Sequence, residues 1–455
     1  MPRLNADEIF AADFVTEPIW WSDIAPQRAA LRPLPARVDV AVIGSGYCGL
    51  SAALELARAG VRVVVFDTGA LGRGASSRNG GIIGGAIKLD WSHLAARYGE
   101  RQAAALLDGA RASFEHLEDL IAQEGLDAEY RRCGRLTLAC NPSQFRALER
   151  EVRALGERAR AVRIVPPERQ REEIGSDFYH GGVLIEEAGG LHPGKLHRGL
   201  HAAASAAGAE LHGYAEVQHL ERTGAGVSLV TARGRTHADQ VLVATNGYTG
   251  SLLPELQRRV VPVSSYIIAT EPLPADLAQR LSPRGRMFVD GNRLLSYFRL
   301  FPDGRRVLFG GRLHLRHVDE RTAARGLYRR MIRVWPELRG CRITHAWKGY
   351  LGFTFDRLPH MGTATGGTEI GGTEVGGMRA GVHFAMGCNG SGVAIASYLG
   401  HQSALKILGR QNRPCPFEEL PFPTHVAYRD RAWFLPALGL WYRALDGLDA
   451  WRPAR

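Results

Sequence analysis

This chain of 455 residues has no long hydrophobic run, no closely spaced pair of cysteines and few lysines. No stretch of about 18 consecutive apolar residues occurs, which excludes a membrane-spanning helix. The six cysteines form no C-x-x-C pair and lack the spacing of a metal site, so we expect reduced, independent thiols. The N-terminus is acidic where a secretion signal would be basic and then apolar. These absences together predict a cytoplasmic globular protein with no metal.

The formal net charge is +11, yet only four of the 57 basic residues are lysines: Lys88, Lys195, Lys348 and Lys406. A basic balance can indicate nucleic acid, an anionic membrane or acidic substrates. The arginines are scattered along the chain in single positions and separate pairs, which is typical of solvated faces. We therefore predict no nucleic-acid partner. Action on modified RNA stays an alternative, which steep salt-dependent tRNA binding would reveal.

The length exceeds what one hydrophobic core usually supports, so two domains are expected. Residues 38–43 are apolar and β-branched, residues 50–59 have helical spacing before Gly60, and residues 61–66 form a second apolar run. This order predicts a βαβ unit. Further helices are predicted at 92–124, 143–160 and 391–408, further strands at 182–186, 227–231 and 241–244, and a separate antiparallel sheet from runs within 258–315.

The turn between the first strand and helix carries a dinucleotide-binding pattern. Its residues, in the order G-x-G-x-x-G, are Gly44, Ser45, Gly46, Tyr47, Cys48 and Gly49. Gly44 permits a tight turn, Gly46 lets a pyrophosphate approach the backbone, and Gly49 lets helix and strand pack closely. The helix N-terminus offers free N–H groups to phosphate. Asp67, followed by Thr68, ends the second strand, where a carboxylate accepts the ribose hydroxyls.

The turn motif does not choose between NAD and FAD; that choice rests on a resemblance to a known family, which two later glycine-rich segments help to carry. Small residues after the second strand would let the backbone approach a flat ring: Gly74, Ala75, Ser76, Asn79, Gly80 and Gly81. A second such run precedes the helix at 391–408 and places another helix N-terminus near a ligand: Gly387, Asn389, Gly390, Ser391 and Gly392. A reduced flavin carries negative charge that such a terminus stabilises. FAD in place of NAD is what the resemblance carried by these segments implies.

With these motifs in order, the chain resembles the D-amino-acid-oxidase-like FAD-dependent oxidoreductases over about residues 16–410, and most of all their γ-glutamylputrescine oxidase branch. The resemblance also rests on GGLHPGKL, VLVATNGYTG, VVPVSSYIIATEPL, YFRLFPDGRRVLFGGR and FDRLPHMG. It implies an α/β fold in which a Rossmann-like FAD-binding domain is interleaved with an antiparallel-sheet substrate domain. It also implies that Val217 contacts the adenine and that Ala244, Thr245 and Asn246 lie near the pyrophosphate.

On this basis we predict an arm at residues 1–37, an FAD-binding domain from 38–95, 181–255 and 341–410, a substrate domain from 96–180 and 256–340, and a tail at 411–455. The implied reaction is oxidation of an amine. A hydride passes from the amine carbon to flavin N5, the imine is hydrolysed, and oxygen reoxidises the flavin to give hydrogen peroxide. A small-molecule amine and oxygen are thus the expected partners, and the oligomeric state stays open.

Four residues are candidates for catalytic roles. Tyr297 and Arg299 lie two apart on a predicted strand and so share a face, where Tyr297 would cover the flavin and Arg299 would hold a substrate carboxylate. Lys348 and His360 fall in segments that border the flavin in the family. Each has a structural alternative: an ordinary salt bridge for Arg299, a solvated lysine, and a core histidine. Arg312 is a weaker candidate for substrate binding.

Two sequence differences from the sarcosine-oxidase branch narrow the predicted attachment of the flavin and the predicted size of the substrate. The sarcosine-oxidase branch attaches its flavin to a cysteine where this chain has residues 347–351 without cysteine, so FAD is predicted to be noncovalent. That branch also has a carboxylate-binding arginine where this chain has Gly80–Gly85, which favours a longer amine. A flavin dehydrogenase that passes electrons to a quinone or a partner protein is the alternative function. The apolar, aromatic residues 432–443 are expected to pack on the body or a second subunit, with peripheral membrane contact as the alternative.

Overall fold

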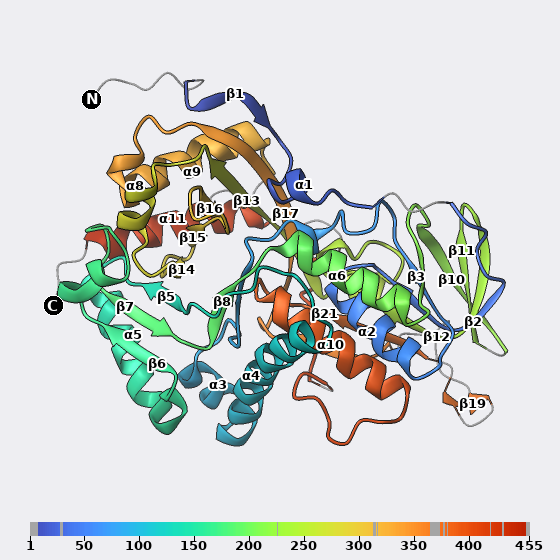
Figure 1. Ribbon diagram of the computed structural model, residues 1–455. Coiled ribbons are helices and arrows are strands. Elements are labelled where there is room, and N and C mark those ends of the chain that lie inside the picture. The colour runs from blue at the N-terminus through green and yellow to red at the C-terminus, as the bar shows by residue number, and fades with distance from the viewer. Residues whose placement is uncertain are drawn as a thin grey trace.

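The computed structural model describes residues 8–27, 31–224, 226–312, 315, 317–364, 374–375, 378–379, 381–418, 420–429 and 432–451. Two sheets organise these residues, and Figure 1 shows one sheet in each half of the molecule. Among the helices described, none combines the length and the apolar character that crossing a bilayer requires. All six cysteines are unpaired, as predicted.

The eight-stranded sheet contains the predicted βαβ unit. Its parallel part is β9 (Glu210–His212), β3 (Val63–Phe66), β2 (Arg37–Ile43), β12 (Gly234–Val243) and β21 (Val382–Met386). Antiparallel strands β10 (Val217–Thr223), β11 (Gly226–Thr231) and β18 (His360–Thr363) extend it. In β2, Val40 and Val42 face one core while Ala41 and Ile43 face the other, as the two-residue period of a doubly covered strand requires.

Helices cover one face of this sheet. Four of them contribute to a single core with β2 and β3: α2 (Tyr47–Arg58), α4 (Glu100–Gln123), α6 (Pro193–Ala206) and α10 (Gly392–Ile407). Gly400 of α10 lies so close to α2 that a Cβ there would be 2.1 Å from the Cys48 carbonyl oxygen. The helix predicted at 92–124 is split into α3 (Trp91–Tyr98) and α4, because Gly99 adopts a φ of 78° between them. The helix predicted at 143–160 is α5 (Pro142–Leu155) with one 3₁₀ turn after it.

The nine-stranded sheet forms the other half. Its order is β1 (Phe10–Val15), β17 (Ile343–Thr354), β13 (Val260–Thr270), β16 (Val307–Gly311), β15 (Ser296–Leu300), β14 (Met287–Asp290), β5 (Arg135–Leu138), β7 (Gly182–Ile185) and β6 (Val162–Val165). The pairs β1–β17 and β14–β5 are parallel and the others antiparallel. Helices α8 (Ala275–Leu281) and α9 (Glu320–Val334) pack on it. The sheet is therefore mixed and larger than its strand-like runs suggested.

The two sheets do not follow the predicted domain boundaries everywhere. Strands β7 and β17 fall within segments assigned to FAD binding, yet both belong to the nine-stranded sheet. The N-terminal arm adds β1 to the edge of that sheet and α1 (Trp20–Asp23) to the joint between the halves. Residues 366–375 form a tandem GGTE repeat, whose glycine and threonine content is typical of a surface hairpin or a loop insertion. The repeat lies outside the described residues except for β19 (Glu374–Val375), which pairs with β20 (Met378–Arg379).

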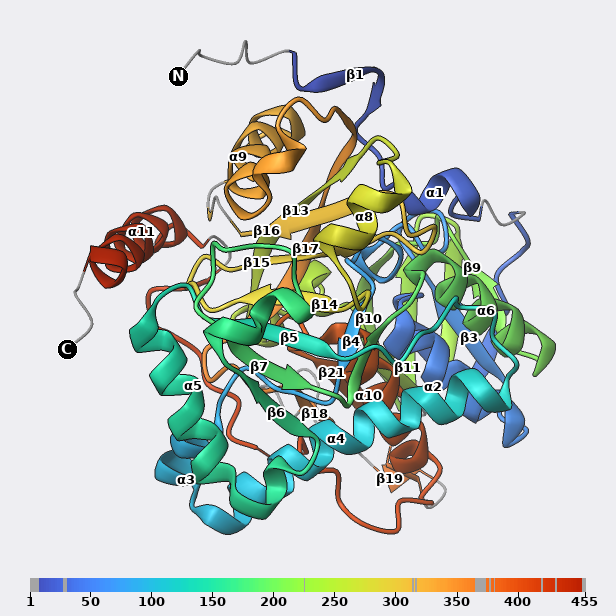
Figure 2. The same ribbon diagram turned by 60° about the vertical axis from the view of Figure 1, so that its left-hand side comes forward.

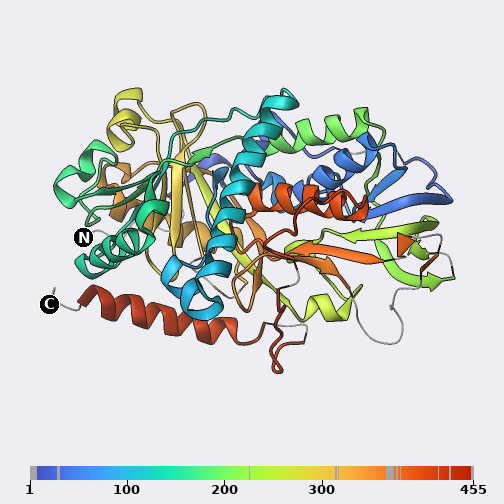
Figure 3. The same cartoon turned by 90° about the horizontal axis from the view of Figure 1, so that it is seen from below.

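The tail ends in helix α11 (Leu435–Trp451), which lies along the outside of the molecule (Figures 2 and 3). Leu435 is buried in a small cluster with Val261, Val263 and Tyr428. Arg293 also holds the helix, through ion pairs of 3.1 Å to Asp446 and 2.6 Å to Asp449. One face of α11 therefore packs on the body, while Trp433 just before it and Leu440, Trp441 and Leu448 within it are exposed.

Candidate active site

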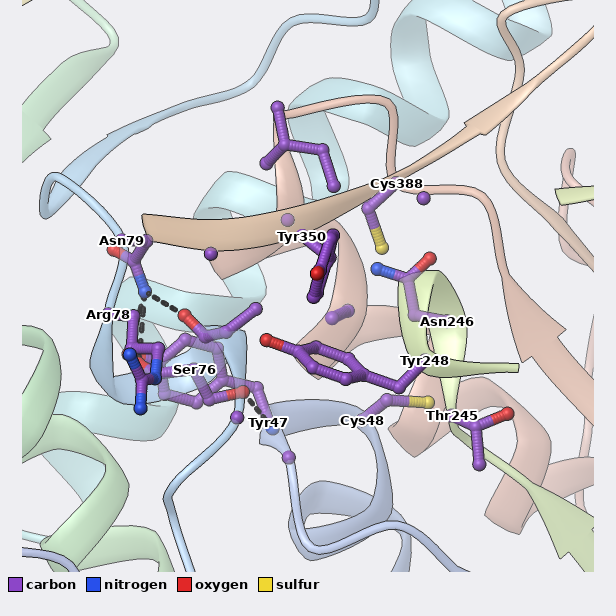
Figure 4. Close-up of a pocket in the computed structure, with 18 of the residues that line it drawn as sticks. Tyr47, Cys48, Ser76, Arg78, Asn79, Thr245, Asn246, Tyr248, Tyr350 and Cys388 are labelled. Carbon is purple, nitrogen blue, oxygen red and sulfur yellow. Dashed lines mark hydrogen bonds between the residues drawn. The ribbon is translucent and has the colours of Figure 1, made fainter. Parts of the chain in front are cut away.

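A cavity of about 950 Å³ lies between the two sheets and takes its lining from both. Ligand pockets typically occupy roughly 300–1,000 Å³, so this one has room for a large cofactor and a small substrate beside it. In Figure 4, Tyr47, Ser76, Arg78 and Asn79 line one side of the pocket, and Asn246, Tyr248 and Cys388 line the other. These residues come from segments far apart in the sequence.

The glycine-rich turn after β2 forms one end of the cavity. Gly44 has a φ of 107°, a conformation that L side chains rarely adopt. A Cβ on Gly49 would lie 1.9 Å from the Gly44 carbonyl oxygen, which confirms that Gly49 is needed for close packing of α2 against the turn. Asp67 at the end of β3 accepts hydrogen bonds from the Ser45 backbone N–H (2.9 Å) and hydroxyl (2.6 Å). The predicted carboxylate thus lies beside the predicted phosphate-binding turn.

Most of the predicted cofactor residues line the cavity. They are Gly44, Ser45, Gly46, Tyr47, Cys48, Asp67, Thr68, Gly74, Ala75, Ser76, Asn79, Gly80, Val217, Ala244, Thr245, Asn246, Asn389, Gly390, Ser391 and Gly392. Three do not: Gly49, Gly81 and Gly387. These three are required for packing instead, since a Cβ on Gly81 would lie 2.2 Å from the Leu191 carbonyl oxygen and one on Gly387 would lie 2.4 Å from the Thr354 methyl.

Three tryptophans hold the segment that follows β3. Trp20 donates its indole N–H to the Asn79 carbonyl oxygen (2.9 Å), and Trp347 donates to that of Arg78 (2.8 Å). Trp21 donates to the Ser77 hydroxyl (2.9 Å). The arm and β17 therefore act together on residues 77–79, of which Arg78 and Asn79 line the cavity. The sequence contains these tryptophans and the glycine-rich segment after β3, but it gives no sign that they are in contact.

Two asparagines with positive φ tie the opposite wall together. Asn246, at a φ of 45°, accepts a hydrogen bond from the Gly387 backbone N–H (2.9 Å). Asn389, at a φ of 50°, accepts one from the Thr354 backbone N–H (3.0 Å), and its own N–H donates to the Gly352 carbonyl (3.0 Å). These bonds fix the loop before α10 against β17. The N-terminus of α10 is thereby held at the cavity wall.

One face of the nine-stranded sheet walls the part of the cavity beyond the loops. One row of paired residues crosses five neighbouring strands of this sheet: Thr137 (β5), Val289 (β14), Tyr297 (β15), Gly310 (β16) and Ile267 (β13). All of these except Gly310 line the cavity. A Cβ on Gly310 would lie 2.4 Å from the Tyr297 ring, so glycine leaves the space that this ring fills. The Tyr297 hydroxyl is 2.9 Å from that of Ser265. Burial raises the pKa of Tyr297 to about 12, so the phenol stays protonated near neutral pH.

Lys348 lines the cavity, as predicted for a site residue, but its ammonium is already paired. Its Nζ lies 3.2 Å from a Glu320 carboxylate oxygen and 3.1 Å from Nε2 of His317. The charge of Lys348 is therefore balanced within the protein. Of the four catalytic candidates, only Tyr297 and Lys348 line the cavity.

Arg299 and His360 take structural positions. Nη1 of Arg299 donates to the carbonyl oxygens of Gly81 (2.8 Å) and Leu191 (2.9 Å), so two backbone segments bind the guanidinium that was expected to hold a substrate carboxylate. Burial lowers the pKa of Arg299 to about 10. His360 lies 3.0 Å from the Asp356 carboxylate and stacks on Phe422 with ring centroids 4.0 Å apart. Neither residue lines the cavity.

Sequence reasoning missed or undervalued five cations of the cavity lining, which are Arg73, Arg78, Lys88, Arg135 and Arg312. Lys88 and Arg135 were not considered, and Arg312 was only a weak candidate, yet all three line the cavity. The scarcity of lysine is a signal that points to Lys88, because few lysines are available for any role. Arg135 and Arg312 carry no such signal, because only the strand pairing of the sheet brings them to the same wall.

The cavity fits FAD on its own geometry. A Cβ on the turn residue Gly46 would lie 3.0 Å from the Ser76 hydroxyl, which accepts a hydrogen bond from the Tyr47 backbone N–H (3.0 Å) at the start of α2. Two helix N-termini, those of α2 and α10, meet the same cavity. Among the residues described, the only thiols in its lining are Cys48 and Cys388, and burial raises the pKa of both, that of Cys388 to about 12. Protonated thiols are poor nucleophiles.

Comparison with known proteins agrees with this geometry. Residues 39–404 match the family described as DAO, FAD dependent oxidoreductase. A probable oxidoreductase OrdL from Rhizobium meliloti (strain 1021) is 31% identical over 434 residues, covering 94% of this chain and 97% of the relative. Gamma-glutamylputrescine oxidoreductase from Escherichia coli (strain K12) is 32% identical over 386 residues, covering 84% and 86%. The crystal structure of glycine oxidase from Geobacillus kaustophilus superposes with a TM-score of 0.69 at 22% identity, over 86% of this chain and 100% of that one, which shows a shared fold.

Proposed function

The chain belongs to the DAO family of FAD-dependent oxidoreductases, and from this premise we propose that it oxidises an amine or an N-substituted amino acid, with oxygen as the electron acceptor. The family membership confirms the resemblance predicted from the sequence and makes FAD the cofactor. FAD, when bound, accepts the hydride equivalent from the carbon next to nitrogen. The residues described above would bind it between the turn after β2 and the N-terminus of α10.

The absence of a histidine or a carboxylate from the substrate end of the described cavity lining is the observation that carries this proposal. No histidine lines the cavity among the described residues, and its carboxylates are Asp67 and Glu216. Both belong to the end where the nucleotide is expected, because the Ala215 backbone N–H donates to the Asp67 carbonyl oxygen (2.8 Å). Oxidation of an amine that enters uncharged needs no strong protein base, because the flavin performs the difficult step. The Tyr297 phenol, protonated near neutral pH, positions the substrate and excludes water.

A substrate panel tests the proposal directly. Polyamines, N-alkyl amino acids and γ-glutamyl amines would each be added to the purified holoenzyme without oxygen, and loss of the visible flavin band would be recorded. At least one class is expected to bleach the flavin and, in air, to consume oxygen and yield hydrogen peroxide. The name of the Escherichia coli relative supports including γ-glutamyl amines. A flavin that no member of the panel reduces would refute the proposal.

A second candidate is a dehydrogenase that passes electrons to a quinone. It is favoured by the solvent face of α11, where Leu440 and Trp441 are 67% and 61% exposed. Apolar and aromatic side chains on one helix face, with basic residues nearby, suit the surface of a membrane that holds quinone. Fast reoxidation of the reduced enzyme by a quinone analogue, with slow reoxidation by oxygen, would select this function. Fast reoxidation by oxygen alone would exclude it.

A further inference from the structure

The outer face of helix α11 is apolar, although this helix lies along the outside of the molecule (Figures 2 and 3). Nine large hydrophobic side chains are exposed among the described residues, and four of them fall within residues 433–448. With about 3.6 residues per turn, the exposed positions of this segment cover less than half of the helix circumference. This outer face consists of Trp433, Pro436, Ala437, Leu440, Trp441, Ala444, Gly447 and Leu448, with Arg443 at its edge.

The acidic residues of α11 point the other way, toward the body. Asp446 and Asp449 form the ion pairs with Arg293 described above, and Asp446 also accepts hydrogen bonds from the backbone N–H groups of Arg293 (3.2 Å) and Leu294 (3.4 Å). A helix that only covers a water-soluble body keeps its charged residues on the solvent side. In α11 the carboxylates lie on the inner side and leucine and tryptophan on the outer side. The outer face therefore suits a second apolar medium.

The charges around the outer face are mainly basic. Residues 429–455 contain five arginines and three aspartates, and Arg293 of the body binds two of these aspartates. Arg443 is exposed at the edge of the outer face. Helices that lie in the plane of a membrane interface combine Trp and Leu on the buried side with basic residues on the polar side. Because anionic lipid headgroups attract basic residues, the composition of this segment matches an anionic lipid surface.

A second copy of the chain matches the outer face less well. The middle of α11, which runs from Leu435 to Trp451, is Arg443. In a two-fold pair of antiparallel helices that cross at their middles, each Arg443 would lie beside its own copy. Like charges brought together at an interface are unfavourable. Lipid phosphates would instead surround Arg443 with negative charge.

We propose that the outer face of α11 docks the enzyme on a bilayer that contains anionic phospholipids, with Leu440 and Trp441 entering the boundary between headgroups and acyl chains. The contact is peripheral, since none of the described helices could span a bilayer. The inference goes beyond the proposed function and does not depend on it. Phe353, which lines the cavity, packs against the cluster that contains Leu435 on the inner side of α11. Docking would therefore hold this wall of the cavity near the lipid surface.

Sedimentation with vesicles tests the docking surface without turnover. The holoenzyme would be mixed with vesicles of phosphatidylcholine, alone or with phosphatidylglycerol, and the bound fraction measured at increasing lipid concentration. Binding to the anionic vesicles is expected to be at least about tenfold tighter and to weaken as salt screens the headgroups. Leu440→Gln combined with Trp441→Gln should weaken it at least about tenfold. Leu31→Gln, which changes a leucine that is 69% exposed in the linker before β2, should leave it unchanged.

Tryptophan fluorescence shows which part of the protein enters the lipid. Brominated phosphatidylcholine in the anionic vesicles quenches a tryptophan that lies among the acyl chains. Wild-type fluorescence should fall on binding. Trp433→Phe combined with Trp441→Phe keeps apolar rings on the outer face, so this variant should still bind but lose much of the quenching. Quenching equal to that of the wild type would show that other tryptophans enter the lipid and would overturn the role of the outer face.

Oligomeric state separates the bilayer from a second copy. If the wild type is a dimer that Leu440→Gln with Trp441→Gln separates into monomers, and it binds no vesicles, then a second copy covers the outer face and the proposal fails. A wild type that binds neither kind of vesicle refutes docking whatever its oligomeric state. Wild-type affinity in that double variant would refute the role of the outer face. Both side chains are largely exposed, so the variant should fold, which circular dichroism and flavin absorbance check.

Discussion

Leu440→Gln should weaken the binding of the holoenzyme to anionic vesicles by about fivefold to thirtyfold. Leu440 is 67% exposed, so contact with lipid would bury about two-thirds of its side chain. Full burial of a leucine side chain contributes about 1.5–3 kcal/mol, so this contact contributes about 1–2 kcal/mol. Because about 1.4 kcal/mol corresponds to a factor of ten in an equilibrium constant, the expected loss of affinity is about fivefold to thirtyfold.

The exposed fraction ranks the variants of the outer face of α11. Leu448 is 53% exposed, so Leu448→Gln should weaken vesicle binding less, by about fourfold to fifteenfold. Leu440→Met keeps the apolar volume and should bind like the wild type. Leu31→Gln is the matched control, because Leu31 is 69% exposed but lies outside α11.

Lipid titrations at a fixed protein concentration give the apparent dissociation constant of each variant, from sedimentation and from tryptophan fluorescence. Unfolding in urea checks that the variants keep the stability of the wild type. Leu440→Gln that binds anionic vesicles as tightly as the wild type would refute the reasoning. So would Leu31→Gln that loses as much affinity as Leu440→Gln.

Three further predictions concern the cofactor. Gly49→Ala should lower the stability of the fold by about 2–3 kcal/mol and abolish FAD retention, because its Cβ would lie 1.9 Å from the Gly44 carbonyl oxygen; urea unfolding and flavin absorbance measure both. Trp20→Phe should raise the FAD dissociation constant about fivefold to thirtyfold, because it leaves the Asn79 carbonyl oxygen without its indole donor; flavin fluorescence titration measures this. Acid precipitation should release all the FAD into the supernatant, because burial keeps both cavity thiols protonated.

Matched controls exist for two of these predictions. Gly447→Ala in α11 meets no atom within 4 Å, so it should leave stability unchanged or slightly higher. Trp433→Phe changes a tryptophan that is 67% exposed and should not affect FAD affinity. Gly49→Ala with wild-type stability, Trp20→Phe with wild-type FAD affinity, or flavin that stays with the acid precipitate would each contradict the corresponding prediction.

Local patterns allowed much of the fold to be predicted. The strand, glycine turn and helix at residues 38–59 appear as β2 and α2, since each depends on neighbours within a few positions. The strands at 182–186, 227–231 and 241–244 are confirmed as parts of β7, β11 and β12. The membership of β7 in the nine-stranded sheet was not predictable, because a buried strand does not encode its partner.

For Arg299 the sequence predicted the direction of the side chain but not the backbone groups that bind it. The spacing of Tyr297 and Arg299 predicted a shared face, and both do meet the glycine segment after β3: a Cβ on Gly80 would be 3.0 Å from the Tyr297 ring, and one on Gly81 would be 2.9 Å from Nη1 of Arg299. Yet the backbone at Gly81 binds Arg299 and takes it out of the cavity lining. Strand periodicity predicts the direction of a side chain but not what covers it.

The sequence by itself determined the cofactor class, the family and most residues that surround the nucleotide, because the glycine turn and its helix are contiguous and their chemistry is local. Only the tertiary structure decided which charges are balanced. Lys88, Arg135 and Arg312 come from three distant segments, and the tertiary fold brings them to one cavity, whose described carboxylates are Asp67 and Glu216. Electrostatic energy depends on distance in space, which the order of residues does not contain.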